Sequence, residues 1–252
     1  MRHCRARAAA HTVGSGAPGG RRNRWKGPLL MLCQIVLFDG FDPLDVIAPY
    51  EVLFAGSMAA PGQLSVELVS AEGPREVPSG AGLLTLRATG RLDPRRAGLV
   101  LVPGAVGPLG AGADAGGPGR EDTVPALLAR SLSTGLPALL KEALERPGTI
   151  VATVCGGSLV PAMAGLIEGR HVTTNHLGLD ALAATGAVAV DARIVDDGDL
   201  VSGAGVTSGL DLGLHLLERE LGPRIAHAVE RLFAHERRGT VWRATGPVPA
   251  AF

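Results

Sequence analysis

The stretch TIVATVCGGSLVPAMAGLIEG, residues 149–169, changes its pattern at Cys155. The residues before the cysteine form a short apolar run rich in β-branched side chains, which predicts a buried strand. The residues after it pass two glycines and continue with an apolar pattern of helical spacing. Cys155 therefore stands where a strand is expected to turn into a helix. Gly156 and Gly157 allow a tight turn and the close approach of a substrate.

Strand and helix patterns also alternate on both sides of this stretch. Strands are predicted at 33–38, 64–71, 83–88, 98–105 and 149–154, at 171–174, and as two or three short pieces within 187–205 around a DDGD turn. Helices are predicted at 42–56, 124–131, 136–145, 177–185, 206–221 and 223–237, with a long loop over 106–125. This order predicts a three-layer α/β sandwich with a mostly parallel central sheet, of flavodoxin-like type.

The first predicted helix begins with clear local signals. Asp42 is a suitable N-cap, and Pro43 suits the first helical position. Pro49 is expected to kink or interrupt the helix, because proline lacks the backbone N–H that the helix needs. The residues expected to face inward are Leu44, Ile47 and Val52.

Three loops follow predicted strands and are candidates for the reactive site. They read FDGFDPLD (38–45), VPGAVG (102–107) and VCGGS (154–158). In mostly parallel sheets, ligands bind just beyond the carboxyl ends of the strands. The three loops are therefore expected to meet.

Cys155 is the candidate nucleophile of this site. Its place before a helix N-terminus is expected to favour thiolate over thiol, and a sharp strand-to-helix turn would project its side chain as a nucleophile elbow does. The alternative is a buried structural cysteine, since free cysteines are often small core residues.

A carboxylate and two backbone groups could complete the chemistry. Asp45 has apolar neighbours, so a raised pKa and proton exchange with the thiol are expected; the alternative is a solvated acid in the first helical turn. The N–H groups of Ala105 and Gly156 would form a two-donor site for a developing anion. Taken alone, Pro103 and Gly104 before Ala105 indicate no more than a turn.

Histidines give weaker signals. His176 lies about 20 residues beyond Cys155 and is a possible partner of the thiol, with capping or surface roles as alternatives. His215, His227 and His235 lack metal-ligand spacing and are interpreted as ordinary surface or core residues. No metal is predicted, and the sequence contains neither a Walker-type phosphate loop nor a dinucleotide fingerprint.

Composition limits the classes of function. The 252 residues are 46% hydrophobic and 3% aromatic, with no apolar run long enough for a membrane-spanning helix. Residues 1–30 carry seven basic side chains and no acid, whereas the remainder carries 17 basic and 24 acidic groups. An acidic body argues against nucleic acid as a partner. The isolated Cys4, Cys33 and Cys155 form no pairing framework and predict a reducing compartment, the cytoplasm.

The ends of the chain are expected to lie outside the domain. Residues 1–30 lack both apolar periodicity and the apolar core of a secretory signal, and they are interpreted as a disordered basic tail. Met31 directly precedes the first strand and is an alternative start. The domain is expected to span 31–238, followed by a C-terminal tail at 239–252.

Taken together, several segments resemble the DJ-1/ThiJ/PfpI family, within the class I glutamine amidotransferase-like superfamily. The matching pieces are VLFDGFDPLDVIAPYEVL, LVLVPGA, TVCGGSLVPAMAGLIEGRHVTTNH and GAGVTSGLDLGLHLLERELG, which together span roughly residues 32–235. The resemblance implies a nucleophilic Cys155 with Asp45 beside it. Within the family, the segment around Asp45 looks most like isonitrile hydratases and the amidase-like domains of arabinose-type transcription regulators.

Three departures from the family pattern concern the site. The usual Cys-Thr-Gly is Cys-Gly-Gly at 155–157, and the usual Pro-Gly-Gly is Pro-Gly-Ala at 103–105. The usual Thr-Thr-His-Trp reads Thr-Thr-Asn-His at 173–176, so the histidine is displaced by one position. Gly104, Gly157, Asn175 and His176 are therefore possible substrate-site residues.

The resemblance implies a cysteine-dependent hydratase of an isonitrile or a similar small electrophile. It would give an N-substituted formamide through a thioimidate, without cofactor, and the protein would be a homodimer. The first alternative is a glyoxalase III-like enzyme acting on 2-oxoaldehydes, and the second is a stand-alone sensor or chaperone-like protein with a redox-sensitive Cys155. Direct control of transcription is not expected, because about 17 residues follow 234 and a helix-turn-helix region needs about 100.

Overall fold

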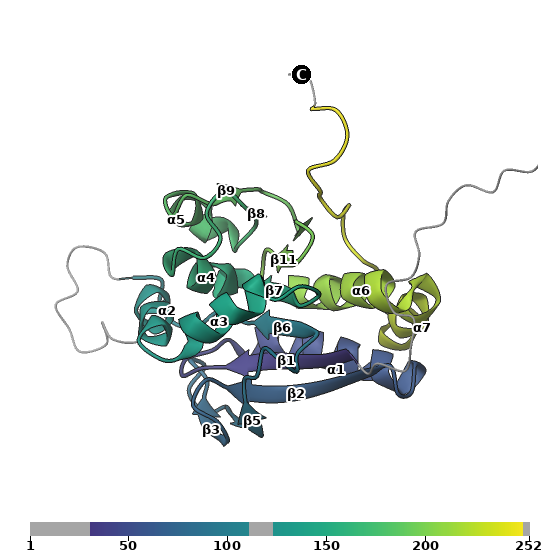
Figure 1. Ribbon diagram of the computed structural model, residues 1–252, viewed down its shortest axis with the longest axis horizontal. Coiled ribbons are helices and arrows are strands. Elements are labelled where there is room, and N and C mark those ends of the chain that lie inside the picture. Colours follow the sequence, from purple (N-terminus) through teal and green to yellow (C-terminus); the bar gives the residue numbers. More distant parts are fainter. Residues whose placement is uncertain (1–30, 111–122, 249–252) are drawn as a thin grey trace, which may run out of the picture.

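The computed structural model describes residues 31–110 and 123–248. The predicted basic tail at 1–30, the larger part of the predicted loop at 106–125 and residues 249–252 lie outside this range. The described part is an α/β sandwich, as predicted, with helices on both faces of a central sheet (Figure 1). Among the described residues, no helix has the length and apolarity needed to cross a membrane.

The central sheet has seven strands in the order β10-β11-β7-β6-β1-β2-β5. All neighbours pair in parallel except β10 and β11, which are antiparallel. The strands are β1 (Met31–Leu37), β2 (Leu64–Ser70), β5 (Gly90–Arg91), β6 (Leu99–Val102), β7 (Ile150–Val154), β10 (Ile194–Asp196) and β11 (Leu200–Gly203). The three central strands β1, β6 and β7 are buried throughout, which explains their continuous apolar sequences.

Two small pairs of strands lie outside this sheet. The predicted strand at 83–88 is β4 (Thr85–Ala88), which pairs antiparallel with β3 (Arg75–Pro78), a strand that the sequence pattern did not indicate. β8 (His171–Val172) pairs in parallel with β9 (Val188–Ala189).

The helices form two groups. On one face, α1 (Pro43–Ala59), α6 (Ser208–Leu221) and α7 (Pro223–Phe233) pack against one another. On the other, α2 (Val124–Leu132), α3 (Leu136–Glu145) and α4 (Leu159–Met163) do so, and α5 (Leu179–Ala183) packs against α4 (Figure 1). Helix α7 ends four residues before the predicted limit at 237.

Helix α1 begins as its sequence predicts but is not interrupted. The Asp42 carboxylate accepts a hydrogen bond from the backbone N–H of Leu44 at 2.9 Å. The helix continues through Pro49, which is buried. Pro49 fits because α6 presents Gly209 to it: a Cβ at that position would lie 2.8 Å from the proline Cδ. Proline therefore packs against a neighbouring helix here instead of ending its own.

The predicted inward face of α1 was largely wrong. Val52 is buried, but Leu44 and Ile47 are 44% and 38% exposed, on the same side as Phe54 and Met58. The buried face is instead formed by Asp45, Val46, Ala48, Pro49, Val52, Leu53, Ala55 and Gly56. Both sides of this helix carry large apolar residues, so periodicity alone could not decide between them.

The segment after α7 is not a free tail in its described part. Trp242 bridges to Val195, donating its N–H to Ile194 and accepting from that of Asp196, both at 2.9 Å. Its ring lies 5.1 Å from that of His171. Residues near 242 therefore extend the sheet beyond β10.

Candidate active site

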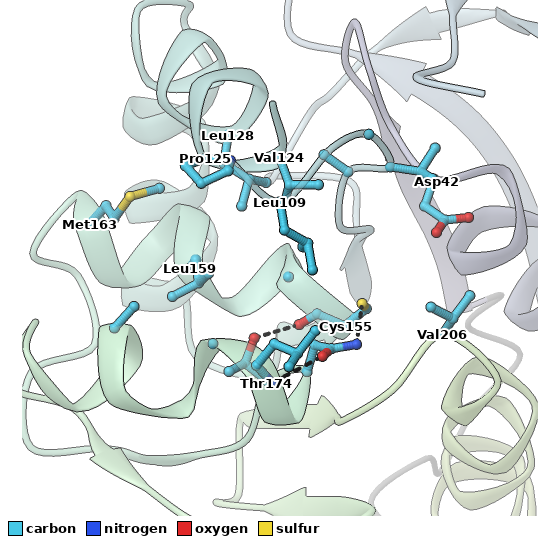
Figure 2. A pocket seen from close by; sticks show the side chains of 18 residues that line it. Asp42, Leu109, Val124, Pro125, Leu128, Cys155, Leu159, Met163, Thr174 and Val206 are labelled. Carbon is cyan, nitrogen blue, oxygen red and sulfur yellow. Dashed lines mark hydrogen bonds between the residues drawn. The ribbon is translucent and has the colours of Figure 1, made fainter. Parts of the chain in front are cut away.

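The three predicted loops do meet at the carboxyl ends of β1, β6 and β7. Between them lies a pocket of about 530 Å³, and α2, α4 and α5 also contribute to its wall (Figure 2). Cys155 and Gly156 come from the loop after β7, Ala105, Val106 and Gly107 from the loop after β6, and Asp42 from the loop after β1.

The predicted elbow at Cys155 is present. Strand β7 ends at Val154, Cys155 adopts φ +54°, and a 3₁₀ turn over Cys155–Ser158 leads into α4. This left-handed conformation costs a non-glycine residue about 1–3 kcal/mol, so it persists only where the surroundings hold it. Thr174 Oγ1 does so by donating to the carbonyl of Cys155 at 2.8 Å (Figure 2). Ser158 Oγ also lies 3.3 Å from that carbonyl, but its hydroxyl makes the shorter hydrogen bond, of 2.7 Å, to the carbonyl of Thr173.

Gly104 and Gly157, which were predicted as possible substrate-site residues, allow close packing at the elbow and do not line the pocket. A Cβ on Gly157 would lie 2.2 Å from the carbonyl oxygen of Val102, so the elbow backbone rests directly on the end of β6. A Cβ on Gly104 would lie 2.7 Å from the Gly156 nitrogen and 2.8 Å from Asp45 Oδ2. Only glycine permits both approaches without moving backbone atoms.

Asp45 is completely buried behind the elbow. Its Oδ2 accepts a hydrogen bond from the Gly104 N–H at 2.9 Å, while its Oδ1 has no hydrogen-bond partner. Burial, and next the nearby charge of Asp42, raises the pKa of Asp45 well above its usual value. Hydrogen bonds from the Gly104 N–H and the Cys155 thiol lower this pKa, but their effect is smaller. The alternative of a solvated first-turn acid is therefore excluded.

The Cys155 thiol is not a stabilised thiolate, contrary to the sequence expectation. Burial, and next the charge of Asp45, raises the Cys155 pKa to about 12; the side chain of Asn175 and the N–H of Gly156 act in the opposite direction. The helix effect is small because α4 has five residues and follows a 3₁₀ turn. The resting site therefore holds a thiol.

The two predicted backbone donors lie at the pocket. The N–H of Gly156 is directed at the Cys155 sulfur, where it favours the thiolate. Ala105 forms an isolated antiparallel bridge with Phe41. The hydrogen bonds of this bridge join the residues on either side of Ala105 to those on either side of Phe41, and not these two residues themselves. In such a pair, the N–H of Ala105 points away from Phe41.

Of the two predicted polar neighbours, Asn175 reaches the sulfur and His176 does not. Asn175 lines the pocket, and its Nδ2 donates to Cys155 Sγ at 3.6 Å. His176 is exposed and lies outside the pocket wall. Sequence reasoning also missed Thr174, although its position just before Asn175 in the same motif was an available signal.

The wall of the pocket is mostly apolar. Its large side chains are Leu109, Val124, Leu128, Leu159, Met163, Leu177 and Val206. The polar side chains described there are those of Asp42, Cys155, Thr174 and Asn175, and the described wall contains no Lys, Arg or His. It therefore suits an uncharged or apolar ligand.

The remaining histidines lie elsewhere. His215 is buried and pairs with Asp196 at 2.8 Å, His235 pairs with Asp211, and His227 is exposed. Over residues 31–110 and 123–248, no three His, Cys, Asp or Glu side chains are grouped so that they could hold a metal ion.

Known proteins are similar to this chain in sequence around the elbow and in fold. The sequence profile of the DJ-1/PfpI family matches residues 128–219, which include β7, Cys155 and the Thr174–Asn175 pair. Over these residues the chain is similar to the DJ-1/PfpI family. Among similar solved DJ-1/PfpI structures, a ThiJ/PfpI family protein from Pseudomonas syringae has a TM-score of 0.65, with 24% identity over 89% of this chain and 84% of that one. DJ-1beta from Drosophila melanogaster also has a TM-score of 0.65, with 16% identity over 82% of this chain and 99% of that one.

Curated proteins that are similar to parts of this chain have different activities. Isonitrile hydratase from Pseudomonas putida is 41% identical over 80 residues, which cover 32% of this chain and 35% of that protein. The HTH-type transcriptional regulator CdhR from Pseudomonas aeruginosa is 33% identical over 101 residues, which cover 38% of this chain and 30% of the regulator. The chain thus spans about a third of the length of the curated relatives that it matches.

Proposed function

We propose that this protein is a cysteine-dependent hydratase that converts an isonitrile, or a similar small electrophile, to an N-substituted formamide. The observation that carries the proposal is the pairing of Cys155 with a fully buried carboxyl group whose Oδ1 has no partner. Such an oxygen can take up a proton without first losing another hydrogen bond.

The reaction begins with addition of the thiol to the isonitrile carbon. The proton of Cys155 passes to Asp45 while the sulfur forms a bond to that carbon, and the same proton is then delivered to the carbon. The product is a thioimidate, R–N=CH–S–Cys. Because the resting thiol has a raised pKa, the proton leaves as the C–S bond forms rather than beforehand.

Hydrolysis then releases the enzyme. Water adds to the thioimidate carbon and gives one proton to Asp45, and the substrate nitrogen is protonated as the C–S bond breaks. The sulfur recovers its proton and the product is R–NH–CHO, so one isonitrile and one water give one formamide. N–H groups near the sulfur stabilise the negative charge that develops in each step.

The pocket supports an apolar substituent on the isonitrile. Its described wall offers large aliphatic side chains and no cation that would bind a carboxylate or phosphate. Asp45 lies outside this wall, behind the sulfur, so it exchanges protons with the thiol while the substituent occupies the pocket. An uncharged alkyl isonitrile meets these requirements.

A second candidate function is ligand sensing without turnover. It is favoured by the similarity to CdhR and by the raised pKa of Cys155, which leaves a thiol of low reactivity at neutral pH. In that case the same pocket would bind its ligand reversibly.

The decisive experiment measures formamide production from cyclohexyl isonitrile by purified protein. We expect turnover by the wild type and its loss in Cys155→Ala, while Cys33→Ala retains it. Cys33 is a matched control because it is a buried cysteine of strand β1, away from the pocket.

Methylglyoxal serves as a second substrate in the same assay. Consumption of methylglyoxal without formamide production would replace the hydratase by the 2-oxoaldehyde alternative. Absence of turnover on both substrates, with saturable binding of the isonitrile, would favour sensing.

A further inference from the structure

The side chain of Asn175 makes two contacts that together fix its orientation. Its Nδ2 lies 3.6 Å from Cys155 Sγ, and its Oδ1 accepts a hydrogen bond from the backbone N–H of Leu177 at 3.1 Å. The second contact caps the 3₁₀ turn His176–Gly178. Turning the amide over would place its NH₂ group against the Leu177 N–H, so the donor must face the sulfur.

The peptide that carries Asn175 is itself held to the elbow. Thr174 is buried, and its hydroxyl donates to the carbonyl of Cys155 at 2.8 Å. Adjacent residues thus contact the two ends of one cysteine: Thr174 its carbonyl oxygen, and Asn175 its sulfur. The amide therefore stays aligned with Sγ when the pocket is empty, so no reorganisation is required as charge develops there.

We propose that Asn175 is a catalytic residue, an obligate hydrogen-bond donor to the Cys155 sulfur as it becomes a thiolate and then to the nitrogen of the bound substrate. The hydrogen bond to the substrate nitrogen rests on the proposed function, whereas the hydrogen bond to the sulfur does not. Asn175 lines the same pocket as the sulfur, so its Nδ2 lies on the side from which a substrate arrives.

The choice of an amide has a chemical consequence. Asn175 stands at the third position of the motif at 173–176, where the resembled family has histidine. An imidazole could accept the thiol proton, whereas an amide whose oxygen is already bonded can only donate. Asp45 is then left as the base beside the sulfur, and its unpartnered Oδ1 is free for that proton.

Electrostatics agree with this geometry. Among the groups that lower the pKa of the Cys155 thiol, the amide of Asn175 has the largest effect, ahead of the N–H of Gly156. Removing the amide should therefore make the thiol less reactive even in the absence of substrate.

Two variants distinguish the role of Asn175 as a donor to the sulfur from its role as the cap of the 3₁₀ turn. Asn175→Asp keeps an oxygen for the Leu177 N–H but removes the donor and adds a negative charge near the sulfur. Asn175→Ser keeps a capping oxygen and stays neutral, and its shorter side chain withdraws the donor from the sulfur. His176→Ala is the matched control, because it alters the exposed neighbour on the same turn.

The first measurement is the rate at which iodoacetamide alkylates Cys155 between pH 7 and 10, followed by mass spectrometry of the peptide that contains it. Loss of a hydrogen bond to a charged group predicts a rate at pH 8 that is about tenfold lower in Asn175→Asp, and lower by a smaller factor in Asn175→Ser. His176→Ala should match the wild type, and all three should melt within a few degrees of it. Equal alkylation rates in all four proteins would overturn the proposal.

The second measurement is kcat/KM for isonitrile hydration in the same proteins. We expect about a hundredfold loss in Asn175→Asp, mainly in kcat, because the donor acts in the transition state. If the wild type hydrates no isonitrile but the order of alkylation rates holds, the role of Asn175 at the sulfur stands and the proposed substrate is wrong. If hydration occurs and Asn175→Ser retains full kcat/KM, the role at the substrate nitrogen is wrong.

Discussion

Asp45 and Asp196 are both buried aspartates, yet their carboxyl groups have opposite surroundings. Asp196 accepts hydrogen bonds on both oxygens, from His215 and Arg243 on Oδ2 and from Arg219 and the N–H of Gly198 on Oδ1. Asp45 has one protein N–H on Oδ2, the neighbouring Cys155 thiol, and no partner on Oδ1. Burial alone therefore does not decide what a carboxyl group does.

The ionisation of the two groups follows from these partners. Burial opposes the charge of Asp196, but His215, Arg243 and Arg219 outweigh it and hold its pKa well below the usual value. At Asp45, burial and the charge of Asp42 outweigh the donors and raise the pKa. A carboxylate surrounded by cations stabilises the fold, whereas one with an open oxygen beside a thiol can exchange a proton. Both conclusions can be tested by replacing each aspartate with asparagine.

The largest expected effect is on catalysis by Asp45→Asn. Asparagine keeps an oxygen for the Gly104 N–H but cannot take up the thiol proton, so kcat for isonitrile hydration should fall about a thousandfold. Steady-state kinetics would measure this, with circular dichroism as a check on folding. A loss below tenfold would remove Asp45 from the reaction.

The next effect is on the stability of Asp196→Asn. Removing this charge leaves Arg219, Arg243 and His215 without their common partner and should lower the free energy of unfolding by about 2–4 kcal/mol. Because the folded pKa is lowered, the stabilisation is present above the unfolded pKa and is lost as pH falls through the folded value. Urea unfolding at pH 7 and pH 3 should therefore show a large difference between variant and wild type at pH 7 and a smaller one at pH 3. Full hydratase activity in the folded variant is the control.

The smallest expected effect is a gain in the stability of Asp45→Asn, opposite in sign to the loss expected for Asp196→Asn. The raised pKa of Asp45 means that the folded protein favours its protonated form, so this group costs stability increasingly as pH rises through the folded pKa. Asp45→Asn should then be more stable than the wild type by about 1–2 kcal/mol at pH 8, with little difference at pH 4. A variant less stable than the wild type at pH 8 would show that Asp45 serves the fold, as Asp196 does.

Much of the fold could be predicted from local pattern. Buried parallel strands read as continuous apolar runs, and Asp42 with Pro43 marked the start of α1 correctly. The prediction failed where two faces of one helix looked alike, since Leu44 and Ile47 are as apolar as the residues that α1 buries. It also failed for residues near 242, because a single bridging residue at Trp242 leaves no periodic signal.

The candidate site was only partly predictable. The sequence by itself determined that a thiol would stand at a strand-to-helix turn, with an aspartate in the first turn of a helix that follows a neighbouring strand, because chain order and parallel pairing place these segments at one edge of the sheet. Tertiary structure decided the protonation of the thiol, since burial and a nearby charge outweigh a short helix. It also decided that Asn175 and not His176 contacts the sulfur, because the direction of a side chain on a turn depends on the caps and contacts around it.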